Sequence, residues 1–351
     1  MVSLSNYVGR EQAYVKHVFL ESYLEALIHK TASVYPHIVY VDGFAGPWQS
    51  TSEKFEDTSF GIGLNALRKA KASWKSSRPN LQMSAYLVEK TNTAYNQLST
   101  VPERFPDLAV KTYQGGFVET LPHILSDIPS DAFTFFLIDP KGWRVPLKLL
   151  SPLLQRPKSE VIFNFMFDFI NRAASISEPT IQVGLDELMH SSAWRDKLIG
   201  PDGSNPQRRK EILCEAFGQS LKKLGGFEYV AETTVLKTTR DRPLYCLFYA
   251  THHKKGIEVF RDCQVRALRE QAKVRAAKKV HQSIAWSGQD ELFKSMDEMS
   301  PDDLGPFLEK ELSNAENYML ANIPVSPDFV RFDTLCAKVM EKNIVRLPEL
   351  N

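Results

Sequence analysis

Five short apolar runs in the first half of the chain alternate with segments of helical periodicity, and this alternation limits the fold more than any other feature. The runs are bounded by polar or turn residues and cover 37–41, 83–88, 109–113, 133–138 and 161–165. The segments between them are long enough for crossover helices and cover 60–74, 92–100, 117–128 and 147–154. This spacing predicts an α/β fold, with a parallel sheet and helices on both faces.

The rest of the chain predicts further helices and one hairpin. Residues 11–32 and 179–224 have helical patterns, and the apolar runs 227–236 and 244–249 are joined by a charged turn. That pair predicts an antiparallel hairpin on the edge of the sheet. The expected domains are a Rossmann-like domain over 1–260 with a helical insertion at about 170–224, a basic helical linker over 261–287, and a helical or winged-helix-like C-terminal domain over 288–351.

Composition excludes several classes of protein. The chain has 351 residues, 43% of them hydrophobic, and a net charge of +1, which predicts a folded protein with a full core. No apolar run approaches the ~20 residues needed to span a bilayer, and the N-terminus lacks the pattern of a secretory signal. We therefore expect a cytoplasmic protein without a membrane partner.

The four cysteines show no CxxC or Cys/His spacing, so the sequence predicts neither a disulfide framework nor a zinc site. Buried free thiols are expected at Cys214, Cys246, Cys263 and Cys336.

The first predicted strand ends in Asp42-Gly43-Phe44-Ala45-Gly46. Glycine is typical both of a tight turn and of a backbone that approaches a ligand closely, and this stretch alone does not separate the two. In open α/β sheets, however, ligands bind beyond the carboxyl ends of the strands. The residues that follow the other strands therefore decide between the two interpretations.

Those strand ends favour an adenosyl cofactor. Glu89 ends the second strand, where an acid can accept hydrogen bonds from ribose hydroxyls, and Gly115-Gly116-Phe117 follows the third. Neither GxGxxG nor GxxxxGK[ST] is present, which disfavours nicotinamide and nucleoside-triphosphate chemistry. The sequence thus predicts S-adenosylmethionine as cofactor, with a site at the first three strand ends made of Asp42, Gly43, Phe44, Ala45, Gly46, Glu89, Gly116 and Phe117.

Three motifs together resemble one known family. The stretches VYVDGFAGPW, FLIDPKGWRVPL and EVIFNFMFDFINR are similar to those of the three-Cys-motif partner proteins, a bacterial group with a Rossmann-type methyltransferase domain, over about residues 14–262. The resemblance implies a cofactor cleft lined by the glycine loop, Glu89 and Asp139. It also implies a protein partner with a metal-cluster-like cysteine motif, and a winged-helix segment in some members. The chain departs from the family at Trp48, where a second small residue is often found.

The turn Asp139-Pro140-Lys141-Gly142-Trp143 also resembles the DPPY turn of enzymes that methylate exocyclic amino groups of adenine or cytosine. In that turn the acid accepts a hydrogen bond from the amino group, and the aromatic residue stacks on the extruded base. The resemblance implies that Asp139, Pro140 and Trp143 are the catalytic residues. Lys141 replaces the second proline, and Gly142 moves the aromatic residue one position later.

Other polar residues have two interpretations each. Asn164 interrupts an apolar run, either as a strand-end amide bonded to backbone or as a residue of the cleft. Asp168 and Arg172 are four residues apart, which is more typical of an ion pair than of a substrate contact. Paired histidines without a carboxylate or cysteine partner, such as His252 and His253, are more often solvent-facing than ligands, so we do not assign them to the site.

A basic stretch has two interpretations, a solvated helix face or a contact with nucleic acid. Residues 261–281 carry seven Lys or Arg with few apolar positions, so this helix and the C-terminal domain could contact DNA or RNA. The leading hypothesis is a methyltransferase that modifies an exocyclic amino group of a nucleic-acid base. The alternative is a catalytically silent partner or regulatory subunit with the same fold, which binds nucleic acid or a protein. Methylation of a small molecule or a protein also stays open.

Overall fold

The structure, a computed structural model, describes residues 2–7, 9–46, 50, 55–238, 240–287, 304–325 and 328–350. At 201–202 and 278–287 it describes the backbone alone. Trp48, the residue at which the chain departs from the resembling family, lies outside the described residues.

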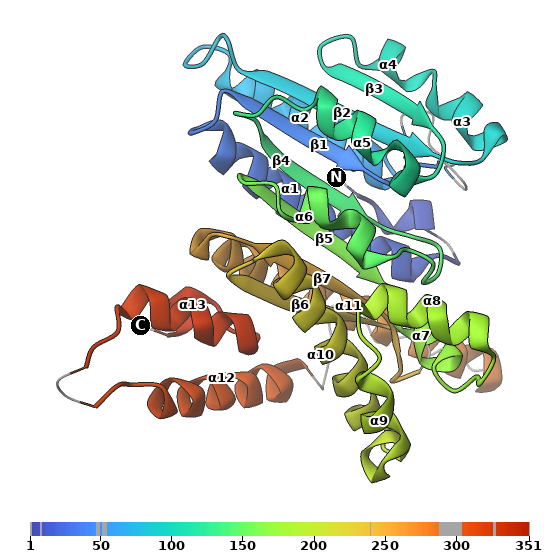
Figure 1. The fold of residues 1–351 in the computed structure, drawn as a ribbon, viewed down its shortest axis with the longest axis vertical. Coiled ribbons are helices and arrows are strands. Elements are labelled where there is room, and N and C mark those ends of the chain that lie inside the picture. The colour runs from blue at the N-terminus through green and yellow to red at the C-terminus, as the bar shows by residue number, and fades with distance from the viewer. Residues whose placement is uncertain are drawn as a thin grey trace.

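A seven-stranded sheet with the order β3-β2-β1-β4-β5-β7-β6 forms the centre of the protein (Figure 1). Its strands are β1 His37–Asp42, β2 Gln82–Glu89, β3 Ala109–Gln114, β4 Phe133–Ile138, β5 Ser159–Phe165, β6 Tyr229–Leu236 and β7 Pro243–Thr251. The first five are parallel, whereas β7 runs antiparallel to both β5 and β6. The predicted Rossmann-like α/β fold with an antiparallel edge hairpin is confirmed.

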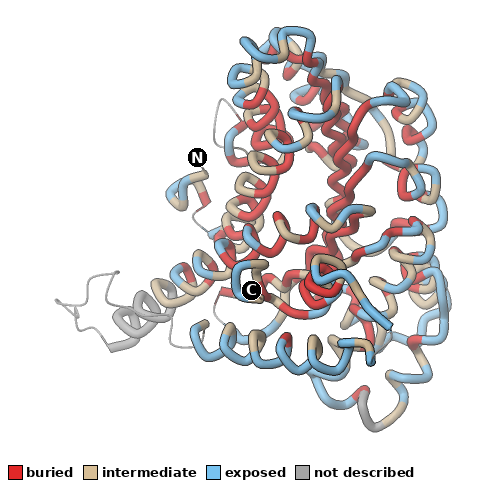
Figure 2. Tube along the Cα trace, turned by 90° about the vertical axis from the view of Figure 1, so that its left-hand side faces the viewer, coloured by how far each residue is buried: buried red, intermediate tan, exposed pale blue. Residues whose placement is uncertain are grey.

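The middle strands are apolar because both of their faces are covered. Every residue of β1, β4 and β5 is buried, and alternate residues belong to two separate hydrophobic clusters. Val39, for example, packs on one face and Tyr40 on the other. This explains why these strands are continuous apolar runs in the sequence rather than alternating ones. Figure 2 shows the buried strands as a layer between the partly exposed helices.

Helices cover both faces of the sheet. The helices are α1 Glu11–Ala32, α2 Ser59–Trp74, α3 Asn92–Leu98, α4 Val101–Arg104, α5 Phe117–Asp127, α6 Ser151–Leu154, α7 Phe167–Ala173, α8 Pro179–Met189, α9 Trp194–Ile199, α10 Pro206–Gly225, α11 Lys254–Ser287, α12 Leu304–Ala321 and α13 Phe332–Lys342. Short 3-10 helices are η1 Leu4–Tyr7, η2 Leu147–Leu150, η3 Pro201–Ser204 and η4 Leu347–Glu349. Helices α1, α2 and α11 contribute to one cluster, and α5, α8 and α10 to the other.

The connections create a switch point between β1 and β4. The chain leaves β1 toward β2 through α2 on one face, and reaches β4 from β3 through α5 on the other. Strand order therefore reverses at β1, and the loops after β1 and β4 diverge at that place. In sheets of this kind the crevice outside the carboxyl ends at the switch point is where ligands bind.

The expected boundary at residue 260 falls inside a helix, because α11 is continuous from Lys254 to Ser287. Its first half packs against α1, and Arg261 is only 2% exposed. The Arg261 guanidinium donates to the carbonyl oxygens of Met340 at 2.6 Å and Glu341 at 3.0 Å. Residues of α13 belong to the same hydrophobic cluster as α1 and α11. The C-terminal segment is thus packed onto the sheet domain.

The C-terminal region is helical, as predicted, but the described residues after β7 contain no strand. A winged helix needs strands for its wings, so the described part of this segment does not have that form. Among the described residues, no helix is both long and apolar enough to cross a bilayer.

Candidate functional site

Asp42 supports the glycine loop from within the protein. Its side chain is fully buried and accepts hydrogen bonds from the Phe44 N–H at 3.0 Å, the Ser59 hydroxyl at 2.6 Å and the Tyr40 hydroxyl at 3.1 Å. The bond to Phe44 N–H makes a local turn of the kind Asp often forms, and the bond from Ser59 ties the loop to the start of α2. Burial raises the pKa of Asp42 to about 6.

Gly43 lies against an aromatic ring. A Cβ at this position would come within 2.8 Å of Phe117 Cγ, so packing alone requires glycine here. Phe117 is buried at the start of α5, and the Phe44 ring packs against it with centroids 5.8 Å apart. The Ala45 N–H donates to the Val88 carbonyl at 2.8 Å, which ties the loop to β2. The tight-turn interpretation therefore accounts for Gly43, while Phe44 and Gly46 remain half-buried.

Glu89 ends β2 beside this loop. Its side chain is 4% exposed, and Oε1 accepts a hydrogen bond from the Thr91 N–H at 2.6 Å. The Gly115 N–H donates to the Glu89 carbonyl at 3.0 Å, so the backbone after β3 lies next to this acid. Gly115 and Gly116 are half-buried, and Gly116 precedes the first turn of α5. An acid and a half-exposed backbone thus adjoin each other at the ends of β2 and β3.

Asp139 follows β4, on the other side of the switch point. Lys16 of α1 forms an ion pair with its carboxylate. Asn164 of β5 donates a hydrogen bond from Nδ2 to Asp139 Oδ1 at 2.5 Å. Residues 137, 139, 162 and 164 share one face of neighbouring strands and line a cavity of about 10 Å³ together with Lys16. We call Lys16, Asp139 and Asn164 the strand-end site.

The charge of Asp139 follows from these partners. Burial opposes ionisation of the carboxyl, but the Lys16 ammonium and the hydrogen bonds from Lys16 and Asn164 outweigh it and lower the pKa of Asp139. The neighbouring His17 is buried, and burial lowers its pKa to about 3, so this imidazole is neutral at pH 7. The Lys16 ammonium is therefore the cation that balances Asp139.

The turn after Asp139 directs its aromatic residue, Trp143, toward α8. Pro140 is buried, and Gly142 has φ +114°, a conformation that other residues rarely adopt. Trp143 is half-buried in the cluster beneath α8, where its indole faces Gly184. The indole Nε1 is buried and has no hydrogen-bond partner among the described residues. Trp143 thus packs on α8, and only part of its ring remains exposed.

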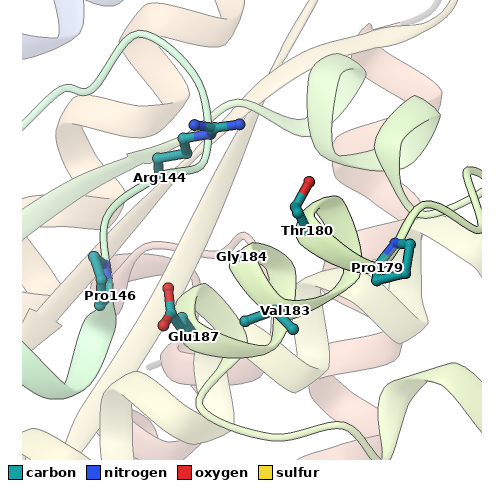
Figure 3. A pocket seen from close by; sticks show the side chains of 7 residues that line it. All are labelled: Arg144, Pro146, Pro179, Thr180, Val183, Gly184 and Glu187. Atoms are coloured by element: carbon teal, nitrogen blue, oxygen red, sulfur yellow. The ribbon is translucent and has the colours of Figure 1, made fainter.

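A surface groove of about 380 Å³ lies between this turn and α8 (Figure 3). It is lined by Arg144, Pro146, Pro179, Thr180, Val183, Gly184 and Glu187. The groove is next to the turn that carries Asp139, but neither Asp139 nor a residue of the glycine loop lines it.

Sequence reasoning missed Lys16. No motif contains it, and its place opposite Asp139 depends on how α1 packs across the sheet. Asn164, for which two interpretations were open, contacts Asp139 and is therefore a residue of the strand-end site. Because Asn164 Nδ2 points toward a carboxylate, Oδ1 points away from it; this Oδ1 is buried and accepts no hydrogen bond from the described residues.

The remaining polar residues have structural roles. Arg172 forms the expected ion pair with Asp168 at 3.2 Å, and Lys237 adds a second pair to the same carboxylate at 2.9 Å. His252 packs against Phe227 with ring centroids 4.6 Å apart and the rings tilted by 31°. These residues belong neither to the strand-end site nor to the glycine loop.

The basic stretch 261–281 is only partly available to nucleic acid. Arg261, one of the seven basic residues of this stretch, is buried, because one side of α11 packs on α1 and β6. Arg266, Arg269 and Lys273 are exposed, and their spacing places them along one side of the helix. A short basic stripe therefore remains where a basic helix was predicted.

Fold and site together define an α/β protein with a Rossmann-like sheet and an acidic residue at the carboxyl end of each of the strands β1, β2 and β4. No protein-family model matches the chain, and no curated protein matches it. Among solved structures it is similar to protein LPL1258 from Legionella pneumophila, of the family DUF519, with a TM-score of 0.40 and 13% identity over 68% of this chain and 84% of that chain. A similarity of this size does not assign the chain to a family.

Proposed function

We propose that this chain is an S-adenosylmethionine-dependent methyltransferase that modifies an exocyclic amino group of a nucleic-acid base. The observation that carries the proposal is the position of Asp139. It stands at the carboxyl end of β4, across the switch point from the glycine loop, and its low pKa keeps it an acceptor at neutral pH. The resemblance to the three-Cys-motif partner proteins supports the same activity.

The chemistry of the strand ends fits the adenosyl cofactor. Glu89 offers a carboxylate where ribose hydroxyls would lie, the backbone at 115–116 is half-exposed beside it, and Phe44 offers an apolar ring. When bound, the cofactor supplies an electrophilic methyl carbon. Asp42 would act indirectly, by holding the loop in shape from below.

Asp139 would accept a hydrogen bond from the substrate amino group, which raises the electron density on that nitrogen. A carboxylate has about four acceptor positions, so the bonds from Lys16 and Asn164 leave room for this one. Asn164 and Lys16 fix the orientation of the carboxylate, and correct placement of the nucleophile supplies much of the rate. Trp143 would stack on a base only through the part of its ring that remains exposed.

The test combines cofactor binding with methyl transfer. Calorimetric titration with S-adenosylmethionine should show binding to wild type and a loss of at least about tenfold in affinity in Glu89→Ala. Transfer of a labelled methyl group to a mixture of DNA and RNA should disappear in Asp139→Asn, which should still bind cofactor. Asp107→Asn is the matched control, because Asp107 is an acid paired with Arg68 before the amino end of β3, at the other end of the strand from the proposed site. Absence of cofactor binding in wild type, or unchanged transfer in Asp139→Asn, would refute the proposal.

A catalytically silent partner remains the second candidate, and one observation favours it. Asp139 already has an ion-pair partner in Lys16, and the Phe117 ring already packs on Gly43. Interactions within the protein therefore account for both residues without a ligand. A chain of this kind would bind DNA, RNA or a three-Cys-motif protein without modifying it. Wild type that binds nucleic acid through Arg266, Arg269 and Lys273, yet transfers no methyl group to nucleic acid or protein, would favour this candidate.

A further inference from the structure

Two cysteines far apart in sequence meet beneath the edge hairpin. Cys214 of α10 and Cys246 of β7 are both buried, and their Sγ atoms are 3.6 Å apart. Glu232 of β6 joins them, and one ligand atom from each of the three residues lies within 4.8 Å of the other two. With Lys210 of α10, these residues form what we call the hairpin cluster. It is separate from the strand-end site.

The fold brings these residues together from three elements. Thr234 of β6 stands opposite Cys246 of β7, and Glu232 lies two residues earlier, on the same face of the strand. Helix α10 packs on β6 and β7, and it carries Lys210 and Cys214 one turn apart. No spacing in the sequence shows this arrangement, because each element supplies one ligand.

The Glu232 carboxylate is already oriented. Its Oε1 accepts from Lys210 Nζ at 2.5 Å and from the Thr234 hydroxyl at 3.2 Å. Its Oε2 is buried and accepts no hydrogen bond from any described residue. The Cys214 and Cys246 thiols lie beside this carboxylate as weak donors, and a buried carboxylate oxygen without a strong donor is costly. One oxygen is therefore fixed by other protein groups while the second is available to a cation.

The separation of the two sulfurs suits a tetrahedral metal. Zn–S bonds of about 2.3 Å at the tetrahedral angle place two thiolates about 3.8 Å apart, close to the value found here. Two thiolates and one carboxylate are ligands that Zn²⁺ accepts. The Glu232 side chain is 28% exposed, so the cluster lies near the surface, and a water molecule would complete the tetrahedron.

The charges also balance. With two protonated thiols, the Lys210 ammonium and the Glu232 carboxylate cancel. With Zn²⁺ and two thiolates they cancel again, because the metal replaces two protons. Metal binding therefore leaves no net charge in this buried place, and it releases two protons for each ion bound.

We propose that Cys214, Cys246 and Glu232 bind one Zn²⁺ ion, with water as the fourth ligand and Lys210 orienting the carboxylate. The ion would join α10 to the hairpin β6–β7 and so stabilise the edge of the sheet. This proposal does not depend on methyltransferase activity.

The first test measures metal content. The full-length chain is incubated with ZnCl2, freed of unbound metal by gel filtration and measured by mass spectrometry of the elements. We expect one zinc per chain in wild type and none in Cys214→Ser, Cys246→Ser or Glu232→Gln. The matched controls are Cys263→Ser and Cys336→Ser, which remove cysteines that are also buried but lie outside the cluster. Controls that lose the zinc as well would overturn the assignment.

The second test uses wild type alone and so does not depend on whether a variant folds. Titration of wild type with Co²⁺ should give charge-transfer absorption from thiolate to metal and the intense visible bands of tetrahedral cobalt, saturating at one equivalent. Absence of these bands, together with less than a tenth of an equivalent of zinc, would refute the site. A mass two daltons below the reduced mass, mapped to a Cys214–Cys246 disulfide, would refute it too and would indicate an oxidised pair instead.

Discussion

Two of the lysine–carboxylate pairs in this molecule are mostly buried, and their surroundings differ. In the strand-end site, Lys16 of α1 meets Asp139 at the end of β4, and Asn164 completes the set. In the hairpin cluster, Lys210 of α10 meets Glu232 within β6, next to two thiols. In both places burial opposes ionisation of the acid, and the lysine outweighs it and lowers the carboxyl pKa. One lysine–carboxylate pair thus lies beside an amide at the switch point, and the other lies beside two thiols at the sheet edge.

The largest effect is expected for Lys16→Met. This change leaves Asp139 without its cation, and both side chains are less than a fifth exposed, at 17% and 16%. Removal of one partner of a pair buried to this degree should lower the free energy of unfolding by about 3 kcal/mol at pH 7. Urea unfolding followed by circular dichroism measures it.

The pH dependence gives the control for that result. Because folding lowers the pKa of Asp139, its contribution is present above the unfolded-state pKa, about 4, and is lost as the pH falls through the lower folded-state value. The difference in unfolding free energy between wild type and Lys16→Met should therefore shrink in acid.

An exposed ion pair gives the second control. Lys111→Met, at an exposed pair with Asp127, should lower the free energy of unfolding by less than about 0.5 kcal/mol. An equal cost for the two variants would contradict the burial argument.

Asp42 sharpens the comparison, because it is a buried acid whose pKa moves upward. Its folded-state value of about 6 lies above the ordinary 3.8, so its stabilising contribution is complete below pH 4 and is lost as the pH rises through 6. A shift of about two units corresponds to about 2.7 kcal/mol. The stability of Asp42→Asn relative to wild type should rise by about that amount from pH 4 to pH 7. Denaturant unfolding of both proteins at pH 4 and pH 7 measures this. An equal difference in unfolding free energy at the two pH values would show that Asp42 does not titrate in this range.

Lys210→Met tests the second pair. Glu232 is more exposed than Asp139, at 28% of its side chain, so we expect a smaller loss of about 2 kcal/mol in the metal-free protein. Thermal unfolding in the presence of a chelator measures it. The double variant Lys210→Met/Glu232→Leu should recover most of the loss, because it removes both charges and keeps the packing. A loss larger than that of Lys16→Met would reverse the order of the two sites.

The smallest effect concerns Gly43. In Gly43→Ala the new Cβ meets the Phe117 ring, and the ring must shift, at a cost of about 1 kcal/mol in unfolding free energy. Chemical denaturation should show the loss, and Gly43→Ala/Phe117→Leu should regain part of it. If the double variant regains nothing, contact with Phe117 is not what requires glycine at this position.

The fold was predictable because its signals are local. The β4 run 133–138 is apolar except for Thr134 and is followed by an acid and a proline, and the structure has the strand with the same bounds. The 11–32 helix was also predicted with its observed bounds, because its apolar positions recur along one face. Turn residues and periodicity are sufficient for such elements.

Residues of the candidate sites were predictable only where they directly follow a strand. Asp139 and Glu89 could be proposed from the sequence because parallel strands bring their ends together. Lys16 could not, since its contact with Asp139 depends on the packing of α1 across the sheet. The cysteines gave no signal either, because Cys214 and Cys246 come from a helix and a strand and meet only across the hairpin. Arg261 was misjudged for a related reason: in a sequence, a buried arginine looks like an exposed one.

The packing of the C-terminal segment has a consequence for solubility. β6 is the last strand of the sheet, and its outer side would otherwise offer unpaired N–H and C=O groups to another chain. α13 lies against this strand, where Glu341 accepts a hydrogen bond from the Val230 N–H at 3.1 Å, and Arg261 binds two carbonyls of α13. Helix α13 therefore lies where another strand would pair with β6, and we expect it to oppose strand-to-strand aggregation.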